Sequence, residues 1–170
     1  TAAYLAQKTG EDFRWAVAGR DADKLEALAK ELGGGPGVIR ADVGDYDTLL
    51  QMARRTRVLA TTVGPYIRYG EAVVMACVEA GTSYADLTGE PAFVDRVIDH
   101  CGASAREQRV RVVNCCGFDS IPHDLGAWMM VNELPQEASV KLEGFVSAKG
   151  GISGGTWNSA LEALGNLGET

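Results

Sequence analysis

The chain has 170 residues, of which 46% are hydrophobic and 23% are charged, and its formal net charge at pH 7 is −7. This composition is typical of a globular domain and excludes a disordered or fibrous chain. The acidic balance and the scattered basic residues argue against a nucleic-acid-binding protein. No apolar run approaches the roughly 18 residues of a membrane span.

Strand-like and helix-like patterns alternate along most of the chain. Short apolar or β-branched runs predict the strands, and apolar residues spaced three and four apart predict the helices. The expected strands are 13–18, 38–41, 58–63, 83–87 and 111–115, and the expected helices are 1–8, 25–32, 46–54, 70–80, 91–105 and 122–132. This repeated alternation predicts an α/β fold with a Rossmann-like, doubly wound parallel sheet.

The stretch 58–70 is the centre of this pattern. Its strand, 58–63, is a run of apolar and β-branched residues, which predicts burial on both faces. Pro65 ends the strand because it lacks an amide donor and restricts Gly64 before it, and the next helix is expected from Gly70. Ligands bind beyond the carboxyl ends of parallel strands, so this turn is a candidate site, with an ordinary loop as the alternative.

One expected element is absent. A dinucleotide-binding sheet begins with a strand and a glycine-rich turn that carries the pyrophosphate at a helix N-terminus, and the sequence has no such turn. Because 1–8 reads as the end of the helix that would follow, we expect a Rossmann-like sheet lacking its first strand, in a chain truncated at both ends. Strands 13–18 and 58–63 should then not pair directly. The isolated chain should bind NADP poorly and be inactive.

After Pro135 the pattern changes. Residues 140–145 alternate with period two, which predicts an antiparallel strand, while 149–155 reads as a loop and 156–167 as a helix. We expect residues 1–135 to form a partial NAD(P)-binding Rossmann-like domain. Residues 136–170 are expected to begin a second α/β domain, a truncated substrate domain of the α+β type.

The cysteine pattern bears on metal binding and on the cellular compartment. The four cysteines are Cys77, Cys101, Cys115 and Cys116. Their spacing matches neither a zinc site nor a disulfide framework. We therefore expect no metal, and a reducing, cytoplasmic setting.

Residues at the ends of the first three expected strands are candidates for cofactor binding. Arg20, after Gly19, suits the 2′-phosphate of NADP because a guanidinium is always charged and binds phosphate bidentately. The alternative is a surface arginine near a helix start. Asp42 can accept a hydrogen bond from an adenine amino group or can cap a turn. The residues expected beside the nicotinamide ribose are Thr61, Thr62, Val63, Gly64 and Pro65.

The richest polar loop is 117–124, after the strand 111–115. Ser120, His123 and Asp124 are too close in sequence for a nucleophilic triad. The candidate proton donors are Tyr66, Tyr69 and His123, and the candidate substrate-binding residues are Glu90, Cys116, Gly117, Asp119 and Ser120. The alternatives are helix capping by Asp119 or Ser120, a buried thiol at Cys116, and ordinary first-turn chemistry for Glu90.

Five segments carry a resemblance to a known family: AGRDADKL, TTVGPYIRYG, YADLTGE, CGFDSIPHDLG and SGGT, in this order. As a set they resemble the saccharopine dehydrogenase-like oxidoreductases, and within these the bacterial branch that includes mycobacterial trans-acting enoyl reductases. The resemblance runs over nearly the whole chain. It implies an amino-terminal Rossmann domain with a GATGFxG-type turn, followed by an inserted mixed α/β domain.

The function that this resemblance implies is NADP(H)-dependent oxidoreduction, with hydride transfer to an enoyl or related intermediate of lipid or polyketide synthesis. The alternatives are a non-catalytic NADP-binding or scaffold protein and a saccharopine-type amino-acid dehydrogenase. The expected partner is a small-molecule or acyl-chain substrate. Peripheral association with a membrane or lipid surface, and a homodimer through the second domain, are left open.

Overall fold

The computed structural model describes residues 1–10, 12–135, 137–147 and 149. Its strands are β1 (Ala16–Gly19), β2 (Gly37–Arg40), β3 (Val58–Thr61), β4 (Ser83–Asp86) and β5 (Val112–Val113). Its helices are α1 (Ala2–Lys8), α2 (Ala22–Glu31), α3 (Tyr46–Ala53), α4 (Tyr66–Ala80), α5 (Pro91–Glu107) and α6 (Ile121–Asn132). A helix follows each strand, so the predicted α/β alternation is confirmed.

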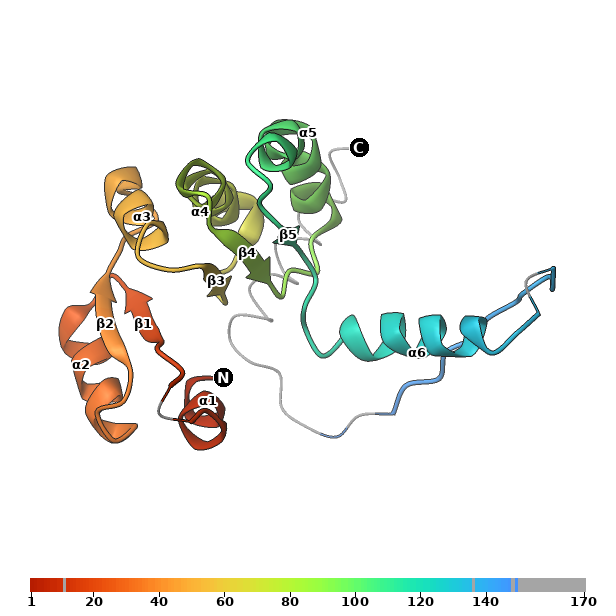
Figure 1. Cartoon of the computed structure of the whole chain (residues 1–170), viewed down its shortest axis with the longest axis horizontal. Helices are drawn as coiled ribbons and strands as arrows, with labels where there is room; N and C mark the ends of the chain where they lie inside the picture. The colour runs from red at the N-terminus through yellow and green to blue at the C-terminus, as the bar shows by residue number, and fades with distance from the viewer. Residues whose placement is uncertain (11, 136, 148, 150–170) are drawn as a thin grey trace.

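The described strands form two parallel sheets (Figure 1). β1 pairs with β2, whereas β3, β4 and β5 form the second sheet in that order. Since β1 and β3 lie in different sheets, the prediction that they do not pair directly is confirmed. The parallel arrangement brings the carboxyl ends of paired strands to one edge of each sheet, where ligands bind in open α/β folds.

The main hydrophobic core lies between the second sheet and a row of three helices. α3, α4 and α5 pack side by side along this sheet (Figure 1). Among the most deeply buried apolar side chains of the core are Leu49, Val74, Cys77, Tyr84 and Phe93. These residues come from all three helices and from the central strand β4, so one cluster holds the second sheet and its helices together.

β3 is buried on one face only. Leu59 and Thr61 are buried, while Val58 and Ala60 alternate with them and are exposed. The prediction that this strand is buried on both faces is therefore wrong. An apolar, β-branched run reports strand propensity, but the number of covered faces depends on what packs above and below it.

α4 begins at Tyr66, four residues earlier than the predicted start at Gly70. Pro65 is the N-cap and has no capping side chain, but a carboxylate from the loop before α5 accepts hydrogen bonds from the first backbone N–H groups. That partner is distant in sequence, so local pattern alone places the start too late. The helix ends at Gly81, whose φ of 73° is the left-handed conformation that glycine adopts most readily.

The segment after β5 packs least. α6 contains no buried residue and extends away from the sheets (Figure 1). The antiparallel strand predicted for residues 140–145 is wrong, because residues 137–147 form neither strand nor helix. The predicted helix 156–167 lies outside the described residues, as does the predicted loop apart from Lys149. Within the described ranges, no helix is both long enough and apolar enough to cross a membrane.

Candidate cofactor and active site

The β3–α4 turn is fixed by hydrogen bonds at its two ends and is exposed to solvent in its middle. Thr61 Oγ1 accepts a hydrogen bond from the backbone N–H of Val63 at 3.2 Å, and the Tyr66 hydroxyl donates to the Thr61 carbonyl at 3.2 Å. Thr62 and Val63 are exposed. The sequence-predicted turn therefore presents its middle residues to solvent while the residues at its two ends, Thr61 and Tyr66, are buried.

The three predicted proton donors occupy different environments. Tyr66 is buried, its ring centroid lies 5.7 Å from that of Phe93, and burial raises the pKa of its hydroxyl, with Asp86 and Glu90 adding to the effect. Its hydroxyl already donates a hydrogen bond to the Thr61 carbonyl. Tyr69 and His123 are both exposed, in the first turns of α4 and α6. Burial and hydrogen bonding thus give Tyr66 a position unlike those of the other two.

Glu90 holds the first turn of α4. Its two carboxylate oxygens accept hydrogen bonds from the backbone N–H groups of Tyr66 at 3.0 Å and Ile67 at 2.8 Å. The residue is half-buried. The residue predicted to bind substrate is therefore brought against the candidate cofactor turn.

A buried carboxylate that the sequence reasoning missed lies at the end of β4. Asp86 is 1% exposed, and four groups donate to its carboxylate. These are the Tyr84 hydroxyl at 2.9 Å, the Thr88 N–H at 3.0 Å, the Asn114 side-chain amide at 2.7 Å and the Cys115 N–H at 3.0 Å. The available signal was the alternation in SYAD, which puts Tyr84 and Asp86 on the same face of the strand.

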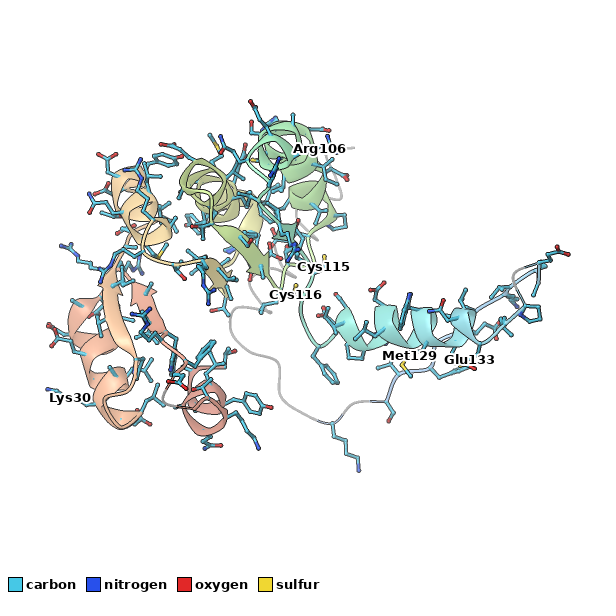
Figure 2. All side chains as sticks on the ribbon, in the orientation of Figure 1. Lys30, Arg106, Cys115, Cys116, Met129 and Glu133 are labelled. Carbon is cyan, nitrogen blue, oxygen red and sulfur yellow. The ribbon has the colours of Figure 1, made fainter. Side chains whose placement is uncertain are left out.

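Asp86 joins the loops that follow β4 and β5. Its carbonyl also accepts the Cys116 N–H at 2.7 Å, and Cys115 has a φ of 60°, a left-handed conformation rare outside glycine. Figure 2 shows Cys115 and Cys116 in the segment that leaves β5. A strained conformation persists where its surroundings fix it, and the Asp86 contacts do so here.

The predicted substrate-binding residues of the second loop lie close to the first. A Cβ atom on Gly117 would lie 2.7 Å from Asp119 Oδ1 and 3.3 Å from Leu87 Cβ, so the two loops leave no room for a side chain there. Ser120 is the N-cap of α6, but no side chain makes a capping hydrogen bond. The capping alternative for Asp119 and Ser120 is therefore wrong, and both side chains lie beside the loop 87–90 or at the start of α6.

The cysteines differ in accessibility, which gives a direct test. Burial raises the pKa of the Cys77 thiol to about 12, whereas Cys116 is only half-buried. A raised pKa lowers the thiolate fraction at pH 8, so iodoacetamide should alkylate Cys116 more than roughly tenfold faster than Cys77. Peptide mass spectrometry of the native protein measures both rates. Denaturation should make the two alkylation rates similar. Equal alkylation rates in the native protein would contradict the burial of Cys77.

The ends of β1 and β2 carry the predicted adenosine-side residues. Gly19 pairs in register with Arg40, and Arg20 follows as an exposed side chain. Asp42 Oδ1 accepts the Gly44 N–H at 2.9 Å, which is the turn-capping alternative. A polar pocket of about 180 Å³ lies beside it, lined by Arg40, Asp42, Asp45 and Thr48. Asp42 therefore caps its turn and also borders a cavity.

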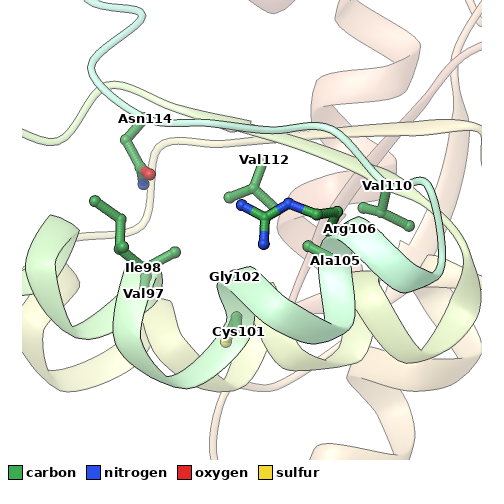
Figure 3. Close-up of a pocket in the computed structure, with 9 residues that line it drawn as sticks. All are labelled: Val97, Ile98, Cys101, Gly102, Ala105, Arg106, Val110, Val112 and Asn114. Atoms are coloured by element: carbon green, nitrogen blue, oxygen red, sulfur yellow. The ribbon is translucent and has the colours of Figure 1, made fainter.

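A larger pocket of about 300 Å³ lies elsewhere, between α5 and β5 (Figure 3). Its lining is mostly apolar, with Arg106 from α5 and Asn114 after β5 as the polar exceptions. None of the predicted site residues lines it. The larger pocket is therefore not at the predicted site, whose polar residues lie at the carboxyl ends of the strands. Within the described residues, no group of three or more His, Cys, Asp or Glu side chains could hold a metal ion.

Comparison with known proteins identifies the family. The profile of the saccharopine dehydrogenase NADP-binding domain matches residues 1–116. A Mycobacterium tuberculosis relative that carries a trans-acting enoyl reductase name is 43% identical over 96% of this chain and 41% of its own length. The mouse saccharopine dehydrogenase-like oxidoreductase is 36% identical over 96% of this chain and 41% of its own length.

Two further similarities extend the picture. The lipid droplet localized protein of Caenorhabditis elegans is 39% identical over 88% of this chain and 36% of its own length. The structure of apo saccharopine dehydrogenase (L-Glu forming) from Saccharomyces cerevisiae matches with a TM-score of 0.64 and 22% identity, over 78% of this chain and 27% of that one. The latter supports the Rossmann-like fold. The chain spans about two-fifths of the length of the Mycobacterium tuberculosis and mouse relatives.

The residues present fit the cofactor of this domain. Thr62 and Val63 are exposed at the carboxyl end of β3, and Arg20 is exposed beyond β1, so both strand ends present residues where ligands bind in open α/β sheets. The chain belongs to the saccharopine dehydrogenase-like oxidoreductases, and its residues 1–116 belong to their NADP-binding domain.

Proposed function

We propose that the full natural protein is an NADPH-dependent reductase acting on an acyl-chain substrate, an enoyl or related intermediate, in the cytoplasm. The observation that carries the proposal is the β3–α4 turn: Thr62 and Val63 are exposed above a buried, hydrogen-bonded support. Such a turn allows a planar ring to lie against backbone while its support stays fixed. The enoyl reductase names of the mycobacterial relatives favour this substrate class.

Each element of the site has a role in this proposal. Bound NADPH supplies the hydride. Thr62, Val63 and Gly64 contact its nicotinamide half, and Arg20 binds its 2′-phosphate. Tyr69 or His123 gives a proton to the reduced substrate, because each is exposed, whereas the hydroxyl of Tyr66 is buried and bound to Thr61.

A saccharopine-type substrate is the second candidate. It carries several carboxylates, which need cationic partners. In the sequence, Arg68 is the one cationic residue close to the turn. A single cation is too few for several carboxylates, so we rank the acyl-chain substrate higher. NADPH oxidation by the full natural protein, followed at 340 nm across enoyl thioesters, ketones and imines, tests the choice. Turnover of imines alone would favour amino-acid chemistry, and NADPH binding without any turnover would favour a scaffold.

Replacing Arg20 by alanine should reduce NADPH affinity by roughly tenfold or more and leave NADH affinity nearly unchanged. A lost charge-assisted hydrogen bond to phosphate is worth about 1.5–3 kcal/mol, and NADH has no 2′-phosphate. Fluorescence titration measures both dissociation constants. Arg55→Ala, which removes another exposed arginine after α3, is the matched control. An equal loss for both cofactors would make Arg20 a structural residue.

A further inference from the structure

Two helix N-termini meet at Glu90. Its own carbonyl accepts the N–H groups of Phe93 at 3.1 Å and Val94 at 3.2 Å, as the N-cap of α5. Its side chain reaches the other helix, where the two oxygens accept from Tyr66 and Ile67. The first turn of a helix leaves backbone N–H groups without intrahelical partners and carries partial positive charge, so a carboxylate there satisfies both needs.

α4 has no local substitute for this carboxylate. Its N-cap is Pro65, which offers no side-chain acceptor, and its first turn contains no acidic residue. By contrast, α2 and α3 are capped by the aspartates that directly precede them, Asp21 and Asp45. The start of α4, and with it the turn from Thr61 to Tyr66, is therefore fixed by a residue more than twenty positions along the chain.

The position of Glu90 is itself fixed by the buried network. Its N–H donates to Thr88 Oγ1 at 3.1 Å, and the Thr88 N–H donates to Asp86 at 3.0 Å. Thr88 is fully buried. On the other side, Arg96 donates to the Ile67 carbonyl at 3.3 Å and so also ties α5 to the first turn of α4. A continuous series of contacts thus runs from the end of β4 to the β3–α4 turn.

We propose that Glu90 is a positioning residue for the cofactor, which holds the nicotinamide-side turn through the first two N–H groups of α4, and that it does not bind substrate. The inference rests on the proposed function, since it takes Thr62, Val63 and Gly64 as the nicotinamide contact. A carboxylate with both oxygens directed at α4 cannot turn to a substrate without releasing the helix start. The same occupancy keeps an external anion from the α4 N-terminus.

The test is Glu90→Gln in the full natural protein, with Glu107→Gln as the matched control at the exposed end of α5. The amide keeps the size of the side chain but replaces one acceptor oxygen by a donor group. We expect NADPH and NADH affinity to fall alike, by roughly tenfold, because the turn lies at the half that both cofactors share. The KM for the acceptor substrate should change less than twofold. The cofactor affinity of Glu90→Asp should lie between that of the unsubstituted protein and that of Glu90→Gln.

Amide hydrogen exchange without cofactor gives a second readout. The N–H groups of Tyr66 and Ile67 should lose protection in Glu90→Gln and keep it in Glu107→Gln. A raised substrate KM with unchanged cofactor affinity and unchanged exchange would overturn the proposal and make Glu90 a substrate ligand. Unchanged values throughout would also overturn it. If Glu90→Gln does not fold, Thr88→Val, which removes the acceptor for the Glu90 N–H, should show the same pattern more weakly.

The two readouts separate this inference from the proposed function. Absence of NADPH binding in the unsubstituted protein would refute the proposed function, and with it the cofactor part of the inference. Lost protection at Tyr66 and Ile67 would still establish the contact itself. Normal NADPH binding together with an unaffected α4 start in Glu90→Gln would refute the inference alone.

Discussion

Replacing Asp86 by alanine should destabilise the fold by about 3–5 kcal/mol, the largest effect that we expect from a single polar substitution. The change leaves the Tyr84 hydroxyl, the Asn114 amide and two backbone N–H groups without their acceptor in a buried place. Each unsatisfied buried group costs about 1–3 kcal/mol, and relaxation keeps the total below the simple sum. The melting temperature should fall by roughly 6–20 °C.

Urea or thermal unfolding measures this change. Asp95→Ala, at an exposed position in α5, is the control and should stay within about 0.5 kcal/mol. Asp86→Asn should be intermediate, because the amide keeps one acceptor oxygen but turns a donor toward the other donors. Equal stability of Asp86→Ala and Asp95→Ala would mean that the buried network does not support the ends of β4 and β5.

Gly70→Ala should destabilise the protein by about 1–3 kcal/mol, although alanine is the better helix former. An added Cβ would lie 2.5 Å from Phe93 Cζ, a distance that real Cβ atoms do not adopt. The Phe93 ring is fully buried and packs against the Tyr66 ring, so it has little room to move. α4 and α5 therefore approach each other through this glycine.

Two further variants make this prediction specific. Gly102→Ala in α5, where a Cβ would meet nothing within 4 Å, should instead stabilise the protein by about 0.5–1 kcal/mol. In a Phe93→Leu background, the cost of Gly70→Ala should largely disappear. Chemical denaturation of the unsubstituted protein, Gly70→Ala, Phe93→Leu and the double variant gives the coupling energy between positions 70 and 93. A coupling near zero would show that Gly70 is not a close contact of Phe93.

Features with a local cause could be predicted from the sequence. Asp45 caps α3 by accepting the Thr48 N–H, and Pro91 stands in the first turn of α5, and both residue types are ordinary signals of a helix start. The existence of each strand and helix and the strand-end turns also follow from patterns within about ten residues, whereas the NADP-binding family is implied by a resemblance over nearly the whole chain. Such signals need no knowledge of what packs against the segment.

Features that depend on distant partners could not be predicted in this way. The start of α4 depends on Glu90, and the role of Asp86 depends on groups after β5. The sequence pattern at 140–145 predicts a strand, but a strand requires a neighbouring backbone that its own residues do not specify. The candidate site is made of such contacts between loops, which explains why its residue types were easier to predict than their roles.

The separation of the two sheets implies unequal local stability. Within the described part of residues 1–40, only Ala29 and Pro36 are buried, whereas the second sheet shares one extensive core with three helices. The β1–α2–β2 unit meets that core through Ile39 of β2 and Ala41 beyond it, so it can open in a subglobal event that leaves most of the core intact. Because Arg20 and Asp42 lie at the ends of this softer unit, a ligand that bridges both sheets raises the free energy of that opening by RT ln(1 + [L]/Kd), where [L] is the concentration of free ligand. In the proposed function NADPH is such a ligand, and its binding would join two cooperative units into one.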